Sequence, residues 1–288
     1  MLVRPGEVAV VVESGEVLAV RADGRRTRSL GRVPRWDTGQ VDAVHVSPDG
    51  RQVLVSVLDD ADEAGPPDAA GAPTNACRAA VYRLVPGRPP ERLLDGASAS
   101  IAPDGRRVAY LRYTRQQSFC VRSRLVVRDL VAGTEQAVGL PGGSALEGTP
   151  PEWPLDWSPD GKRIAFVSER GALVTEVDGW RTTVLGGDHP ADDRRLAPVF
   201  LADGTEAAMT GCCIGGEGRM TAYPATADPH LLFAVATPVT SVRRDRGGNG
   251  LWLTMQETGL WHWHGARLRP VLAHAVQDTG PTALVTSG

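Results

Sequence analysis

Basic clusters and long apolar runs are both missing from this sequence. It contains one lysine, Lys162, among 31 basic residues, and 34 acidic residues bring the formal net charge to −3. Binding to nucleic acid or to an anionic membrane surface needs a concentration of positive charge, so we expect neither partner. No apolar run approaches the roughly 18 residues of a membrane-spanning helix, so we expect no membrane insertion.

An export signal is also missing from the first residues. A signal peptide needs a basic start, an apolar segment and a small-residue cleavage site, whereas the apolar run Val8 to Val12 is only as long as a strand. The chain as written is therefore predicted to be cytoplasmic. Removal of a signal segment would instead make it a periplasmic or extracellular protein.

What the sequence does contain is one hairpin in four copies. They read "VHVSPDGRQVLVSV" (44–57), "ASIAPDGRRVAYLR" (99–112), "LDWSPDGKRIAFVS" (155–168) and "PVFLADGTEAAMTG" (198–211). Each is a short strand, a turn that ends in Asp-Gly, and a second strand with alternating apolar residues. A second hairpin with a Gly turn follows each copy, which makes four strands per repeat. Helical periodicity is absent, so the repeats predict an all-β array.

The two ends of the chain complete the array. Residues 239–275 have the same rhythm without the Asp-Gly turn, and residues 7–30 match a repeat that lacks its innermost strand. The C-terminal "PTALVTSG" can supply that strand and close a ring without open sheet edges. We predict one domain, 1–288: a six-bladed β-propeller of four-stranded antiparallel blades, closed by a C-terminal strand that completes the N-terminal blade. The blades span about 7–31 plus 281–287, 41–95, 98–139, 153–186, 196–235 and 239–273.

The "SPDG[KR]xIAFVS" copies resemble the WD40-like, TolB-type (PD40) β-propeller repeats. The resemblance covers residues 41–211 well, and in the rest of the chain it is limited to the spacing of the predicted strands. True WD40 repeats carry Gly-His and Trp-Asp pairs that do not recur here, and sialidase-type boxes need a residue between Asp and Gly. Motifs of this kind specify blades and not chemistry, so we expect the turn aspartates to accept local backbone N–H groups.

The two faces of the predicted ring differ in the length of their connections. With the strands of a blade named a to d outwards, the a–b and c–d turns share one face, the turn face. The b–c and d–a connections share the other, the long-loop face. Long connections are predicted only there: 59–76, "YTRQQSFCVR" (113–122), 139–154, 186–197 and "GCCIGGEGR" (211–219). Since binding and catalysis concentrate on long loops of a rigid scaffold, we expect this face to carry the function.

All four cysteines fall in the predicted b–c loops of the long-loop face. Cys77 and Cys120 correspond in adjacent blades, which allows a disulfide in an exported protein. Free thiols are the alternative in a reducing compartment. Metal binding by Cys212, Cys213 and His189 lacks the usual zinc spacing. The "WHWH" stretch, 261–264, could bind a metal through two histidines, but packing of the two Trp between blades is favoured. We predict no metal and no cofactor.

Polar residues near the long-loop mouth of the channel are the candidate binding residues. They are Trp36, Asp37, Asp42, Arg115, Gln116, Glu152, Trp153, Asp156, His189, Asp192, Arg194 and Arg243. No catalytic triad, carboxylate pair or nucleophile elbow connects them, so we assign no catalytic residue. Trp157, by contrast, occupies an aromatic position of the repeat and is predicted to be core.

Two functions follow from these features. The first is a non-catalytic binding or scaffold propeller, a monomer that engages a protein or peptide partner through the long-loop face, as the resemblance to TolB-type domains implies. The alternative is a lyase or hydrolase with a polar or metal-assisted site at the channel mouth.

Overall fold

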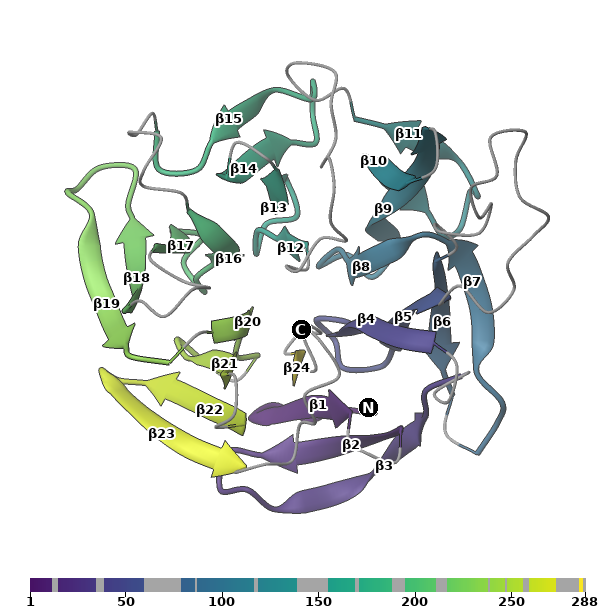
Figure 1. Cartoon of the computed structure of the whole chain (residues 1–288), viewed down its shortest axis with the longest axis horizontal. Helices are drawn as coiled ribbons and strands as arrows, with labels where there is room; N and C mark the ends of the chain where they lie inside the picture. Colours follow the sequence, from purple (N-terminus) through teal and green to yellow (C-terminus); the bar gives the residue numbers. More distant parts are fainter. Residues whose placement is uncertain are drawn as a thin grey trace.

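The computed structural model of the chain is a ring of six sheets around a central axis (Figure 1). It describes residues 1–11, 15–34, 39–59, 79–85, 87–116, 119–138, 155–168, 171–187, 195–210, 217–237, 239–246, 248–255, 259–272 and 285–286. The described strands make six four-stranded antiparallel blades, which confirms the predicted propeller. This part of the chain contains no helix long and apolar enough to cross a membrane.

Each blade runs from an inner strand at the axis to an outer strand at the rim (Figure 1). Blade two comprises β4 (Gly39–Val46), β5 (Val53–Asp59), β6 (Ala79–Leu84) and β7 (Glu91–Asp95). Blade three comprises β8 (Ala97–Ile101), β9 (Arg107–Gln116), β10 (Phe119–Asp129) and β11 (Glu135–Ala137). Blade four comprises β12 (Asp156–Trp157), β13 (Arg163–Ser168), β14 (Gly171–Glu176) and β15 (Thr182–Val184).

The remaining blades follow the same order. Blade five comprises β16 (Leu196–Phe200), β17 (Glu206–Thr210), β18 (Gly218–Tyr223) and β19 (His230–Val235). Blade six comprises β20 (Val239–Arg244), β21 (Leu251–Met255), β22 (Gly259–His264) and β23 (Arg267–Leu272). Blade one takes β1 (Glu7–Val11), β2 (Glu16–Arg21) and β3 (Arg26–Arg32) from the N-terminal part of the chain.

The innermost strand of blade one comes from the other end of the chain. β24 (Val285–Thr286) pairs antiparallel with β1, Val10 opposite Val285 and Ala9 opposite Thr286. This pairing confirms the predicted closure, in which the last strand fills the gap in the first repeat. On the turn face, the N–H of Val3 donates to the Gly50 carbonyl at 3.0 Å, so the N-terminal segment also connects blades one and two.

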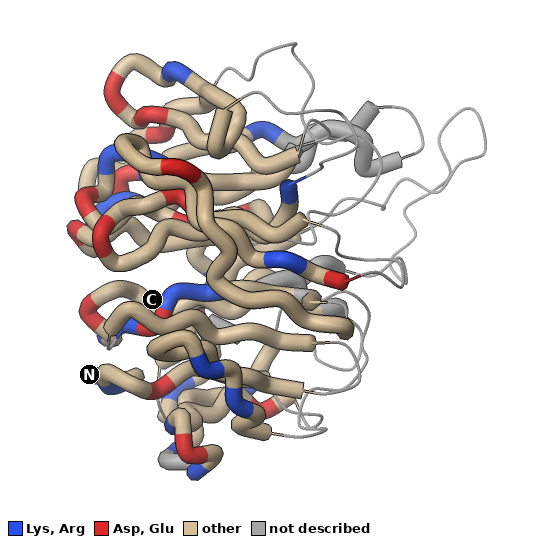
Figure 2. Tube along the Cα trace, turned by 90° about the vertical axis from the view of Figure 1, so that its left-hand side faces the viewer, with Lys and Arg blue, Asp and Glu red and all other residues tan. Residues whose placement is uncertain are grey.

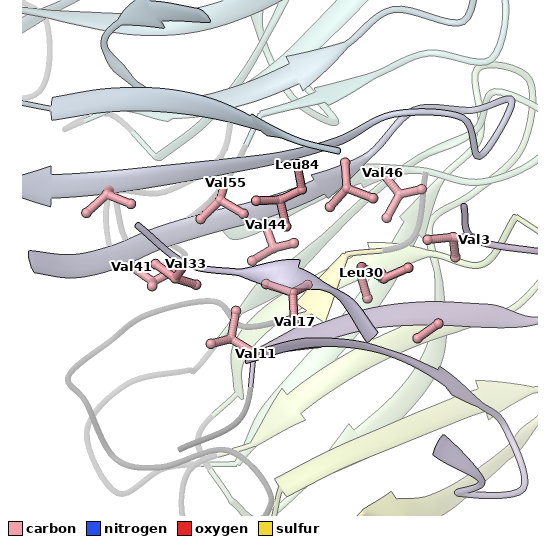
Figure 3. Packing of buried hydrophobic residues seen from close by; sticks show 14 residues of the cluster. Val3, Val11, Val17, Leu30, Val33, Val41, Val44, Val46, Val55 and Leu84 are labelled. Carbon is pink, nitrogen blue, oxygen red and sulfur yellow. The ribbon is translucent and has the colours of Figure 1, made fainter. Parts of the chain in front are cut away.

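The core consists of six apolar clusters, one at each interface between neighbouring blades. The cluster between blades one and two is drawn in Figure 3, where Val11 and Val17 meet Val44 and Val55. Because every sheet is covered by a blade on each side, both of its faces are apolar. The blades therefore form a rigid support for whatever their connections carry. Trp157 is buried between blades three and four, as predicted.

Three arginines join different blades near the turn face. Arg107 donates to the Gly161 carbonyl of blade four at 3.1 Å, and Arg163 donates to the Gly204 carbonyl of blade five at 2.8 Å. Their guanidinium groups also lie over the rings of Trp157 and Phe200, at 5.2 and 4.9 Å. In blade six, Arg246 donates to the Pro48 carbonyl of blade two at 3.0 Å. We call these three residues the arginine clamps.

Candidate functional site

On the turn face, the aspartates of the hairpin turns form hydrogen bonds with nearby backbone groups. Oδ1 of each turn aspartate accepts the N–H two residues further on, at 2.9 Å for Asp49 and 3.1 Å for Asp160. Asp104 and Asp203 do the same, at 2.8 and 2.9 Å. The hydrogen bond from Ser158 holds the pKa of Asp160 below its usual range. The predicted role of these aspartates is confirmed. In Figure 2 the marked acidic residues gather along the left edge, where the tight turns lie.

Connection lengths differ between the two faces as predicted, with one exception. Strands β5 and β6 are separated by residues 60–78, β11 and β12 by 138–155, and β15 and β16 by 185–195. On the turn face each a–b or c–d connection has two to six residues. The exception is 113–122, which we predicted to be a loop. β9 and β10 extend through this segment and pair Thr114 with Arg122, leaving only 117–118 between them.

Two of the predicted site residues are fully described, Asp156 and Arg243. Of Asp42, Arg115 and Gln116 the strand positions are described: Asp42 lies in β4, and the other two lie at the end of β9. The other seven lie outside the described residues: Trp36, Asp37, Glu152, Trp153, His189, Asp192 and Arg194. Cys77, Cys212 and Cys213 also lie outside them, and Cys120 is a backbone position of β10. The predicted disulfide therefore stays a prediction.

Asp156 and Arg243 occupy the same position in their inner strands, and two further polar residues share it. In four blades the N–H that closes the a–b hairpin bonds to a carbonyl five residues later, and the closing residues are Ser47, Ala102, Ser158 and Asp245. Two residues before each of them stand His45, Ser100, Asp156 and Arg243. We call these four residues the axial ring. Each is at least nine-tenths buried.

The ionisable members of the axial ring come from alternate blades, His45 from blade two, Asp156 from blade four and Arg243 from blade six. Burial raises the pKa of Asp156, and the guanidinium groups of Arg244 and Arg243 oppose this. Burial lowers the pKa of His45 to about 3, and the same two arginines act in that direction. The arginines of blade six therefore interact electrostatically with side chains of two other blades, as expected for groups around a common axis.

Asp156 has a hydrogen-bond partner in a neighbouring blade, whereas the ring of His45 has none among the described residues. Asp156 Oδ2 accepts the N–H of Phe200 from blade five at 2.7 Å. Within the described part of the chain neither ring nitrogen of His45 has a hydrogen-bond partner. The backbone of Ile101 lies near the His45 ring and opposes its pKa shift without reaching hydrogen-bond geometry. His45 and Ser100 were not among the predicted site residues; an alignment of the repeats column by column would have found them.

Four inner strands contain a bulge on the long-loop side of the axial ring. The register shifts between Val41 and Ala43 in β4, Ala97 and Ser100 in β8, Leu196 and Val199 in β16, and Val239 and Ser241 in β20. Ser98 and Ala197 have φ of 51° and 46° at these places, which is rare for residues other than Gly. Bulges are common at barrel rims and beside functional sites because they redirect side chains. Asp42 is the extra residue of the bulge in β4.

The histidines of "WHWH" lie away from the axis, in β22. Trp261 and Trp263 pack on the cluster between blades five and six, as predicted. His262 Nε2 lies 2.9 Å from Asp245 Oδ2, and its ring stacks on Trp252 at 4.3 Å. No group of three or more His, Cys, Asp or Glu suited to a metal occurs among the described residues. His262 therefore has a structural partner.

Three solved structures show what this fold is similar to. TolB from Acinetobacter baumannii matches with a TM-score of 0.64 and 14% identity, over 92% of this chain and 62% of that one. A periplasmic gluconolactonase from Pseudomonas aeruginosa matches with 0.52 and 16%, over 95% and 84%. A virginiamycin B lyase from Staphylococcus aureus matches with 0.52 and 13%, over 92% and 83%. No family model and no curated protein matches the sequence.

These likenesses agree with the predicted fold: the chain is a six-bladed β-propeller whose fold is similar to that of TolB. The chain spans less than two thirds of the TolB chain. At these identities the comparisons show the fold, and the similar proteins include both a lyase and a gluconolactonase beside TolB. Fold alone does not imply function, so the function has to be argued from the site.

Proposed function

We propose that this protein is a non-catalytic binding propeller, a monomer that engages a protein or peptide partner through its long-loop face. The observation that carries the proposal is the asymmetry between the faces. Between the described strands, every connection of more than six residues joins strand ends of the long-loop face, while the turn face keeps two to six residues per connection. A rigid ring with variable connections on one side is the arrangement that many binding proteins use.

The turn face is less suited to a partner because its polar groups already have partners inside the molecule. The turn aspartates accept backbone N–H groups, and the arginine clamps donate to carbonyls of other blades. A partner on that side would have to compete with these contacts. The bulges, by contrast, lie on the long-loop side of the axial ring.

A recovery experiment with two loop variants tests this proposal. In the first variant residues 60–75 are replaced by a short Gly-Ser turn, and in the matched control the exposed residues 225–228 of the turn face are replaced in the same way. Native lysate is passed over each immobilised protein, and the bound proteins are quantified. We expect the first variant to lose a partner that the control retains. Equal recovery of every protein by all three chains contradicts the role of 60–75.

The alternative function is a propeller enzyme with a polar site in the channel. The observation in its favour is the axial ring, because His45 and Asp156 are buried ionisable groups with shifted pKa values, lowered to about 3 for His45 and raised for Asp156, and such groups concentrate at functional sites. This alternative predicts that a substrate is turned over and that His45→Gln abolishes turnover. Partner recovery through the long-loop face would be independent of His45.

The cellular compartment of the protein determines which lysate the recovery experiment should use. One of the similar structures is of a periplasmic protein, which supports export as the location to test first. Fractionation of cells producing the full-length gene product decides between export and the cytoplasm. An exported protein would also permit the Cys77–Cys120 disulfide. Alkylation without reductant, followed by intact mass, counts the free thiols.

A further inference from the structure

We propose that the centre of the axial ring binds a small oxyanion, a carboxylate or phosphate group, through buried donors that have no hydrogen-bond partner among the described residues. The site lies inside the channel, close to the turn ends of the inner strands, and is separate from the proposed partner-binding face. Arg244 supplies its charge, and His45, Ser100 and Ser241 supply neutral donors.

The first reason is a concentration of buried polar atoms with no hydrogen-bond partner among the described residues. They are both ring nitrogens of His45, the hydroxyls of Ser100 and Ser241, and Nη1 of Arg244. All of them belong to the inner strands β4, β8 and β20. Buried polar groups are almost always hydrogen-bonded in native proteins, so such a group of orphans indicates a bound molecule or ordered water at this place.

The second reason is that Arg244 acts across the ring on groups of other blades. Nη2 of Arg244, in blade six, makes a long contact of 3.5 Å with the Trp157 carbonyl of blade four. Blade five lies between these two blades in the ring (Figure 1). Arg244 therefore reaches past the inner strand of blade five on its axial side. Its charge also acts on His45 of blade two.

The third reason is the chemistry of the donors, which favours an anion over a metal ion. A guanidinium group has only N–H donors and stays charged, and hydroxyls can donate as well as accept. His45 stays neutral near pH 7, since burial lowers its pKa to about 3, and it offers one further donor. The carboxylate of the ring, Asp156, already accepts the Phe200 N–H. Two adjacent arginines would also repel a cation, and arginine binds carboxylate or phosphate oxygens well.

Two other charged residues near the ring, Asp245 and Arg246, have partners in the protein. Asp245 lies 2.9 Å from His262. Arg246 donates to backbone carbonyls of Val3 and Pro48, and the charges of Asp49 and Asp245 act on it. Nη1 of Arg244 is buried without a hydrogen-bond partner among the described residues, which is why Arg244 is chosen for the test.

Titration of the full chain with sodium acetate and with sodium phosphate, at constant ionic strength, tests the site by calorimetry and by thermal stability. We expect saturable binding of at least one probe, and the probe that binds identifies the oxyanion. Arg244→Met should weaken that binding by about ten-fold or more, because it removes a charged donor. Arg181→Met, an exposed arginine on the turn face paired with Glu176, is the matched control and should leave affinity unchanged.

Ser241→Ala is a second variant, in case Arg244→Met does not fold. It removes one neutral donor and should weaken binding by about three-fold or more. Absence of saturable binding for both probes overturns the proposal. Unchanged affinity in both folded variants overturns it as well, because the anion would then bind elsewhere. Neither result bears on partner recovery through the long-loop face.

Discussion

At the scale of single residues, the repeats have the same residue type at the turn position and different residue types at the position of the axial ring. Asp stands at the same turn position in blades two to five, with the same local hydrogen bond. The axial position holds His45, Ser100, Asp156 and Arg243 instead. Since blades of one fold impose one backbone on these positions, their different side chains are not required by the fold. They are the residues through which individual blades can act.

His45 gives the protein a predictable dependence on pH. Its pKa is about 3 in the folded protein and about 6.5 in an unfolded chain. Above about pH 6.5 the two states bind the same number of protons, whereas below it the unfolded state takes up one more. Stability is therefore fully present above pH 6.5 and is lost as the pH falls towards 3, by up to about 1.4 kcal/mol per pH unit.

Urea unfolding of the wild type and of His45→Asn measures this contribution. Between about pH 7 and pH 5.5 the wild type should lose about 1 kcal/mol more of its unfolding free energy than the variant does. His264→Asn, which replaces an exposed histidine of β22, should follow the wild type. Parallel pH profiles for wild type and His45→Asn would show that His45 is not buried in its neutral form.

At the scale of elements, the blades are held together by apolar clusters and by the arginine clamps. Arg163 illustrates the second kind of contact: it pairs with Glu206 at 2.7 Å, donates to Gly204 and covers the ring of Phe200. A partly buried arginine with several partners contributes more than an exposed ion pair does. The sequence alone gave no sign of these contacts, because they connect residues about 40 positions apart.

Arg163→Met should lower the unfolding free energy by about 1–2 kcal/mol, since it breaks the ion pair and the link to the next turn. Arg181→Met removes only an exposed pair with Glu176 and should change stability by less than about 0.5 kcal/mol. Chemical denaturation of both variants compares the two values. Equal, small losses would mean that the clamps do not hold neighbouring blades.

The closing strand completes the sheet of blade one and with it the ring. β24 pairs with β1 through two residue pairs. A chain that ends at residue 272 would expose the axial edge of β1 and lose the contact between the two ends. We expect it to unfold at lower temperature or to aggregate, and a synthetic peptide of residues 273–288 to restore the stability. A truncated chain as stable as the wild type would contradict this role.

At the scale of the whole molecule, the sequence predicted the ring because its repeats make the local signals consistent. The turn, the alternating strands and the missing inner strand of the first repeat all indicated the same closed propeller. The segment 113–122 was predicted wrongly, because its polar residues and its length were interpreted as a loop. Residues with high β propensity, such as Tyr113 and Phe119, allow β9 and β10 to continue through it. The axial ring was only half predicted, because its members lie about 55 to 90 residues apart and meet only when the ring closes.

The most direct test of the central claim compares the two faces in one measurement. A photoreactive amino acid is placed at Glu217, which is exposed just before β18 on the long-loop side, or at Asp178, which is exposed in the β14–β15 turn. The protein is irradiated in native lysate, and crosslinked adducts are identified by mass. The proposed function predicts a specific adduct from position 217 and none from position 178. Adducts from position 178 alone, or equally from both positions, would contradict it.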